Sequence, residues 1–157
     1  MGEINQMSEP QLVIKEAVKE DVIALSYLMQ ELGYETSLEE MQVRFDHIHN
    51  HIDYKTFIAW LDKKVVGMAG TTQNYFYEQN GKYVRVLALI VNHSYRHRGI
   101  GKILLEAVEN WAIEIGATSV LLNCGNRDER KQAHEFYNSR GYEVKSSGYI
   151  KKLLCPK

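Results

Sequence analysis

The chain has 157 residues, of which 45% are hydrophobic and 25% are charged, a composition that excludes a disordered or collagen-like protein. Its length suits one compact domain. Nineteen Lys and Arg residues stand against 20 Asp and Glu residues, and the resulting net charge of −1 gives no general attraction to nucleic acid.

The first part of the chain is expected to form one strand followed by two helices. Alternating apolar and polar residues predict a strand over Leu12–Ala17, and helical spacing predicts a helix over Glu20–Leu32 that ends at Gly33. Ser37 and Glu40 match a capping box and so predict the start of a second helix. The apolar positions of this second helix are Leu38, Met41, Phe45, Ile48 and Ile52.

Three strands are predicted next. They cover Thr56–Leu61, Val65–Tyr77 and Tyr83–Val91, with turns at Asp62–Lys64 and Gln79–Gly81. The first half of the chain is therefore expected to run strand, helix, helix and three strands.

The second half of the chain alternates helix and strand. A helix is predicted over Gly99–Ile115, a strand covered on both faces over Thr118–Cys124, and a further helix over about Asp128–Arg140. One or two short strands are expected between Tyr142 and Leu154. A strand–helix–strand unit requires parallel neighbours, so Tyr83–Val91 should lie parallel to Thr118–Cys124. The predicted fold class is α/β, a mixed sheet with helices on both faces.

Nothing in the sequence indicates a membrane or secreted protein. The longest uninterrupted apolar run, Val86 to Val91, is far shorter than the roughly 20 residues of a membrane helix. The N-terminus lacks the features of a secretory signal, and Cys124 and Cys155 form no CxxC pair. We therefore expect a single cytoplasmic domain over residues 1–157, with its core over residues 12–154 and free thiols.

The segment from Arg96 to Lys102 combines glycines and cations at the start of a predicted helix. Gly99 and Gly101 let the backbone approach a ligand closely, and a helix N-terminus favours phosphate. Neither a Walker loop nor a dinucleotide fingerprint fits, since Ile103 and Leu104 occupy positions that these motifs reserve for a hydroxyl and a small residue. The pattern predicts a pyrophosphate site; the alternative is a basic helix start with ordinary capping glycines.

Two segments together resemble the signatures of the GNAT (N-acetyltransferase) superfamily. Arg96, Gly99 and Gly101 fill the fixed positions of its acetyl-CoA signature, Q/R-x-x-G-x-G/A. Ala133–Tyr142 resembles the second signature, A-x-x-F/L-Y-x-x-x-G-F/Y, and the order of predicted elements also follows the family. The resemblance implies a mostly antiparallel sheet in which one parallel strand pair splays apart to hold acetyl-CoA.

The resemblance implies a direct transfer of acetyl from acetyl-CoA, as co-substrate, to a primary amine in a ternary complex. The loop N–H groups would bind the pyrophosphate, the strand before the loop would pair with the pantetheine arm, and the N–H of Leu89 would stabilise the oxyanion. The implied catalytic residues are Tyr137 and Leu89. The implied cofactor-binding residues are Leu89, Ile90, Val91, Arg96, His97, Arg98, Gly99, Ile100, Gly101, Lys102, Asn126 and Tyr137.

Roles within this site are open at several positions. Tyr137 could protonate the departing thiolate, but its spacing from Ala133 also describes a packed helix face. Asn126 could bind the pantetheine amides or cap a helix. Many relatives carry a glutamate on the strand before the loop, and this chain has none there. The general base is therefore Glu78, Glu35, His93 or a chain of waters.

The acceptor side and a possible metal site give weaker patterns. Aromatic and acidic side chains on the first two helices and the neighbouring hairpin suit a cationic amine, although strand alternation would also bury Phe76 alone. His47 and His51 have a spacing that zinc sites use, but without a third ligand we expect no metal. The acceptor candidates are Tyr34, Glu35, Asp46, Tyr75, Phe76, Tyr77 and Glu78.

The expected function is acetylation of a small-molecule amine. The alternatives are acetylation of a protein lysine or N-terminus, and a regulatory domain that binds acyl-CoA without turnover. The expected partners are acetyl-CoA and an amine acceptor, with no nucleic acid and no membrane. The acceptor's identity, the use of longer acyl-CoAs and the choice between monomer and homodimer are left open.

Overall fold

The structure, a computed structural model, describes residues 11–123, 131–145 and 148–153. The chain divides into two compact units, Met1–Leu122 and Asn123–Lys157, and each is described by itself. The first unit holds β1 (Leu12–Glu16), η1 (Lys19–Asp21), α1 (Val22–Leu32), α2 (Leu38–His49), β2 (Tyr54–Leu61), β3 (Lys64–Tyr75), β4 (Lys82–Val91), η2 (His93–Tyr95), α3 (Ile100–Glu114) and β5 (Ala117–Leu122). The second holds α4 (Lys131–Ser139).

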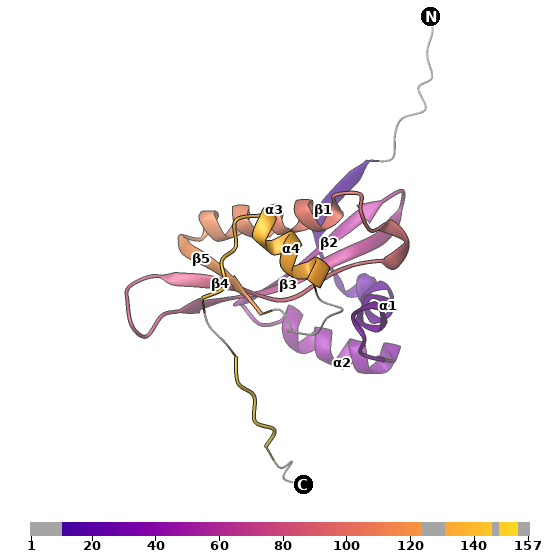
Figure 1. Ribbon diagram of the computed structural model, residues 1–157. Coiled ribbons are helices and arrows are strands. Elements are labelled where there is room, and N and C mark those ends of the chain that lie inside the picture. The colour runs from indigo at the N-terminus through magenta and orange to yellow at the C-terminus, as the bar shows by residue number, and fades with distance from the viewer. Residues whose placement is uncertain (1–10, 124–130, 146–147, 154–157) are drawn as a thin grey trace, which may run out of the picture. The chain divides into compact units, whose positions relative to one another are not determined.

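The strands of the first unit form one sheet in the order β1-β2-β3-β4-β5 (Figure 1). The first three pairings are antiparallel, and β4 pairs with β5 in parallel. The predicted mixed, mostly antiparallel sheet with one parallel pair is therefore confirmed. None of the helices in the described part of the chain is long and apolar enough to cross a membrane.

Helices cover both faces of this sheet, as predicted (Figure 1). On one face α1 and α2 pack on Ile58, Met68 and Ile90, which are almost fully buried. On the other face α3 packs closely, because a Cβ on Gly67 would meet Cδ1 of Leu104 at 3.1 Å. The core on the α1–α2 face consists of Ala17, Val22, Leu25, Leu28, Met41, Phe45, Ile58, Met68 and Ile90.

The predicted capping box at the start of α2 is present. The Ser37 hydroxyl accepts the N–H of Glu40 at 3.1 Å, and the Glu40 carboxylate accepts the N–H of Ser37 at 2.9 Å. This backbone hydrogen bond holds the pKa of Glu40 below its usual value. The expectation that Ile52 lies on the apolar face of this helix is wrong. α2 ends at His49, the Asn50 side chain donates to the Asp46 carbonyl, and Ile52 is 89% exposed.

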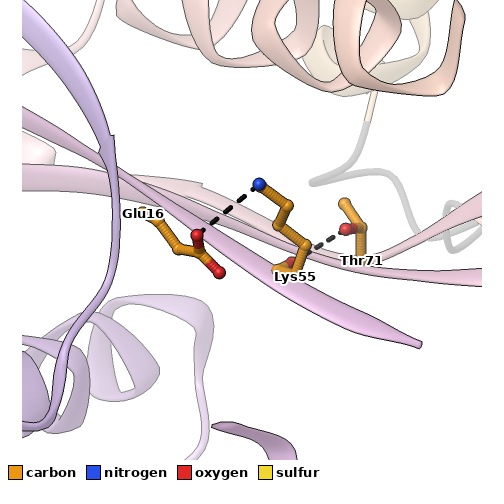
Figure 2. A network of polar contacts seen from close by, with 3 residues as sticks. All are labelled: Glu16, Lys55 and Thr71. Atoms are coloured by element: carbon orange, nitrogen blue, oxygen red, sulfur yellow. Dashed lines mark hydrogen bonds and ion pairs between the residues drawn. The ribbon is translucent and has the colours of Figure 1, made fainter. Parts of the chain in front are cut away.

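Polar contacts join the first three strands beneath α3. Lys55 Nζ lies 3.5 Å from Glu16 Oε1, and the hydroxyl of the buried Thr71 donates to the Lys55 carbonyl at 2.8 Å, as Figure 2 shows. The Lys55 ammonium also lies 5.7 Å from the ring of Phe57 and 5.8 Å from that of Trp111 on α3. These contacts hold β1, β2, β3 and α3 together at the side of the sheet opposite α1.

The C-terminal predictions were less accurate. β5 was expected to be a central strand covered on both faces, yet it is the last described strand of the sheet and its Leu121 is 43% exposed. No strand occurs in the described residues of the segment 142–153, where one or two had been predicted. Cys124, Cys155 and the start of the helix predicted from Asp128 lie outside the described residues.

Candidate functional site

The pairing of β4 with β5 ends partway along β4, where β5 itself ends at Leu122. Its register ends with Val86 opposite Leu122, while β4 continues for the residues Leu87–Val91. Within the described part of the chain, these last residues of β4 pair with β3 alone. Among the described residues, β4 beyond Val86 therefore has one edge without a partner strand, called the open edge below.

A β-bulge lies where the open edge begins. Gly70 is opposite Ala88 and Thr71 is opposite Val86, so Leu87 is the extra residue on β4. A bulge of this kind increases the local twist and redirects the strand. It separates the part of β4 that pairs on both sides from the part that pairs only with β3.

The orientation of the backbone at the open edge follows from one hydrogen bond. The N–H of Asn92 donates to the Val66 carbonyl of β3 at 2.7 Å. Because an antiparallel ladder alternates, the N–H of Ile90 also points toward β3, while the N–H groups of Leu89 and Val91 point toward the open edge. Leu89, which the sequence singled out as an oxyanion donor, has its N–H on the side that could meet a ligand.

A short turn that contains η2 connects β4 to the segment Arg96–Lys102, called the glycine loop below. The Asn92 side chain caps η2 by accepting the N–H of Ser94 at 2.9 Å, and Arg96 Nε donates to the Val91 carbonyl at 3.4 Å. His97 (φ 65°) and Gly99 (φ 80°) both adopt the left-handed conformation. Few non-glycine residues adopt this conformation, and histidine is among those that do so more often.

Helix α3 begins directly after these left-handed residues. Its first intrahelical hydrogen bond runs from the Ile103 N–H to the Gly99 carbonyl, so the N–H groups of Ile100, Gly101 and Lys102 precede it. The Ile100 side chain is buried against the sheet, which fixes the start of the helix. Three oriented N–H groups at a fixed helix terminus can bind an anion.

Cations surround this helix terminus. Three cationic side chains here are exposed, those of Arg96, Arg98 and Lys102. None of them forms an ion pair with another described residue. The Arg98 guanidinium lies 5.1 Å from the ring centroid of Tyr95, over which Lys64 Nζ also lies at 5.7 Å. This positive charge, which has no carboxylate partner among the described residues, adds to the helix dipole. The contact of Lys64 with Tyr95 was not predicted, because Lys64 lies at the start of β3, far from Tyr95 in the sequence.

The other candidate residues are less fully placed. Asn126 lies outside the described residues. Tyr137 is half-buried on α4, where its ring packs edge-on against Phe136 at 5.3 Å and Tyr142 at 6.1 Å. Both open interpretations of Tyr137, acid and packed ring, remain compatible with this environment.

The general-base candidates lie on three separate segments. Glu35 is exposed between α1 and α2, Glu78 is exposed between β3 and β4, and His93 opens η2. In the part of the chain that the structure describes, no contact joins any two of them. β4 itself carries no carboxylate, as the sequence indicated.

The acceptor candidates do not form a closed aromatic pocket. Tyr34, Tyr75 and Tyr77 are exposed, and Phe76 packs instead against Tyr83 at 4.8 Å. Among the remaining candidates, Asp46 is exposed on α2.

The histidines of the predicted metal alternative have other partners. His49 stacks on Phe45 at 5.1 Å, and His51 Nδ1 accepts the N–H of Asp53 at 3.2 Å. A search of the described residues finds no group of three side chains that could hold a metal ion.

Comparison with known proteins gives a consistent result. The family model described as Acetyltransferase (GNAT) family matches residues 22–142. The chain is 28% identical over 137 residues to the uncharacterized N-acetyltransferase YhdJ of Bacillus subtilis, covering 87% of this chain and 92% of that protein.

Solved structures show the same fold. A GNAT family acetyltransferase of Staphylococcus aureus matches with a TM-score of 0.79 and 29% identity, over 90% of this chain and 98% of that one. The aminoglycoside N-acetyltransferase AAC(6')-Iy, solved in complex with CoA, matches with a TM-score of 0.82 and 18% identity, over 96% and 100% of the two chains.

The left-handed turn before α3 can be tested by replacing Gly99. A Cβ there would meet no atom within 4 Å, so any cost of a side chain is conformational. We expect Gly99→Ala to lower the free energy of unfolding by about 1 kcal/mol. Gly99→Asn should cost less, because asparagine tolerates this conformation better. Urea denaturation followed by circular dichroism measures both; wild-type stability of the alanine variant would contradict the assigned turn.

Proposed function

The chain belongs to the Acetyltransferase (GNAT) family, and from this premise we propose that it transfers acetyl from acetyl-CoA to the amine of a small molecule. The observation that carries the proposal is the open edge of β4 running directly into the glycine loop at the start of α3. An extended pantetheine arm could add to the edge as a strand would, with its pyrophosphate at the helix terminus. The family match spans both structural units, which supports treating them as one domain.

The cofactor-binding part of the proposal uses mainly backbone groups. The N–H groups of Ile100, Gly101 and Lys102 would bind the pyrophosphate, helped by the exposed Arg96 and Arg98. His97 and Gly99 would shape the turn, and Leu89, Ile90 and Val91 would form the strand beside the pantetheine arm. Asn126 and Tyr137 complete the proposed set. The relative AAC(6')-Iy was solved with CoA, which supports this choice of co-substrate.

The chemical steps that we propose are a direct attack and two proton transfers. The neutral amine attacks the thioester carbonyl carbon, and the carbonyl oxygen, as it becomes negative, accepts the N–H of Leu89. The C–N bond forms, the C–S bond breaks, and the Tyr137 hydroxyl gives its proton to the departing thiolate. The proton lost by the amine goes to Glu78, Glu35, His93 or water. One oxyanion donor in a dry site contributes about 10²–10³ in rate.

CoA binding tests the glycine loop. Acetyl-CoA and CoA at 100 times Kd should each stabilise the protein by about 2.7 kcal/mol, seen as a rise in Tm. Pantetheine should stabilise it much less, since it lacks the phosphates that the loop would bind. Gly101→Val should weaken CoA binding by obstructing the approach of phosphate to the backbone. Equal protection by pantetheine and CoA in a thermal melt would contradict the loop assignment.

Turnover is tested by thiol release from acetyl-CoA across a panel of small amines, lysine peptides and N-terminal peptides. We expect release with small cationic amines, because the elements around the proposed acceptor site carry exposed aromatic and acidic side chains. Propionyl-CoA in parallel reports on acyl length. Release with peptides alone would favour protein acetylation, and CoA binding without release on any amine would favour a regulatory acyl-CoA-binding domain.

Replacing Tyr137 with Phe separates chemistry from packing. The substitution removes one hydroxyl and keeps the ring that packs on Phe136 and Tyr142. If the hydroxyl protonates the thiolate, kcat should fall about 10²-fold with acetyl-CoA affinity nearly unchanged. Steady-state kinetics with the best amine of the panel, together with a thermal melt, measure this. Wild-type kcat under conditions where chemistry limits the rate would exclude the acid role.

A further inference from the structure

A hydrogen bond between distant residues joins α1 to the turn that leads into the glycine loop. Glu31 Oε1 accepts the backbone N–H of His93 at 2.7 Å, across a sequence separation of 62 residues. Glu31 lies in the last turn of α1, and His93 is the first residue of η2. Both residues are exposed, so burial of apolar surface does not explain the contact.

The position of Glu31 is unfavourable for α1 itself. A carboxylate in the last turn of a helix opposes the helix dipole, which costs some stability. The last turn of α1 holds no basic residue to offset this charge. A charge-assisted hydrogen bond to His93 offsets the cost, which points to a role outside the helix.

The segment between β4 and α3 has few other anchors. In the described part of the chain, the Asn92 N–H holds its first residue to β3, Asn92 contacts Ser94 and Tyr95 within η2, and Lys64 Nζ lies over the Tyr95 ring at 5.7 Å. Glu31 supplies the hydrogen bond that ties this turn to a helix on the α1–α2 face. Its loss would remove the hydrogen bond between η2 and α1 and leave the contacts from Asn92 and Lys64 in place.

We propose that Glu31 is a positioning residue for the cofactor loop. Its carboxylate holds η2 and so raises the fraction of molecules whose loop is arranged to receive pyrophosphate. This inference rests on the proposed function. Because the apparent Kd is the intrinsic Kd divided by the competent fraction, loss of the hydrogen bond weakens CoA binding. The effect is expected in the affinity for CoA and in the KM for acetyl-CoA.

Electrostatics alone predicts the opposite effect of losing Glu31 on the affinity for CoA. Removing a negative charge near a phosphate site should strengthen the binding of CoA, an anion. Glu31→Gln removes the charge but keeps an oxygen that can accept the His93 N–H, whereas Glu31→Ala removes both. Gln30→Ala is the matched control, since Gln30 is the exposed neighbour on the same helix. The three variants therefore separate positioning from charge and from general effects on α1.

Isothermal titration with CoA, using the full chain, tests the proposal. We expect Glu31→Ala to bind CoA about 5- to 10-fold more weakly, Glu31→Gln to stay within about twofold of wild type, and Gln30→Ala to be unchanged. Amide hydrogen exchange without ligand should be faster at His93 in Glu31→Ala than in Glu31→Gln. In steady state, Glu31→Ala should raise the KM for acetyl-CoA, and Glu31→Gln should leave it near the wild-type value.

Several results would overturn the proposal. Unchanged or tighter CoA binding by Glu31→Ala would do so, as would equal weakening in Gln30→Ala, because either result removes the specific link to His93. These outcomes leave the proposed function intact, since the wild-type protein still binds CoA. If the wild-type protein fails to bind CoA, the proposed function fails and the role of Glu31 fails with it.

Discussion

Backbone hydrogen bonding along β4 is the constraint on which the candidate site depends. A strand inside a sheet normally pairs on both edges, and buried backbone groups without partners are costly. β4 pairs with β3 over its length but with β5 only as far as Val86. The bulge at Leu87 marks the change, and the alternation of the ladder then leaves the groups of Leu89 and Val91 at the open edge. An extended ligand can satisfy these groups as a neighbouring strand would.

The tight packing of α3 gives the helix terminus at the end of this edge a fixed position. Gly67 allows the approach, since a Cβ there would lie 3.0 Å from the Ile90 carbonyl and 3.1 Å from Leu104. The buried side chains of Ile100 and Leu104 then fix the first turn of α3 on the sheet. This packing holds the N–H groups of that turn in place, whereas the residues before the helix depend on the contacts of η2.

Local features and the parallel pairing of β4 with β5 were predictable from the sequence, whereas a change of register and single contacts between distant residues were not. The capping box of Ser37 and Glu40 and the turn at Gly99 are local, and both occur as expected. The bulge at Leu87 depends on the register with β3, and the contact of Glu31 with His93 joins residues far apart in the sequence. Ile52 was misplaced because helical periodicity continues past the point where Asn50 ends the helix. The contacts of η2 with Glu31 on α1 and with Lys64 on β3 were not predicted, because each joins residues far apart in the sequence.

The reliance on backbone groups has a consequence for specificity. Main-chain N–H groups can bind a pyrophosphate whatever side chains accompany them, provided that glycine occupies the turn and apolar residues fix the helix. Binding through backbone groups tolerates changes of side chain, which agrees with a fold that this chain shares with AAC(6')-Iy at 18% identity. Preference for an acceptor has to come from side chains, and we expect it to vary independently of the cofactor site. In this chain the exposed side chains of Tyr34 and Tyr75 lie on the α1–α2 connection and the end of β3, outside the loop that would hold CoA. Substitutions there should change which amine reacts without changing the affinity for CoA.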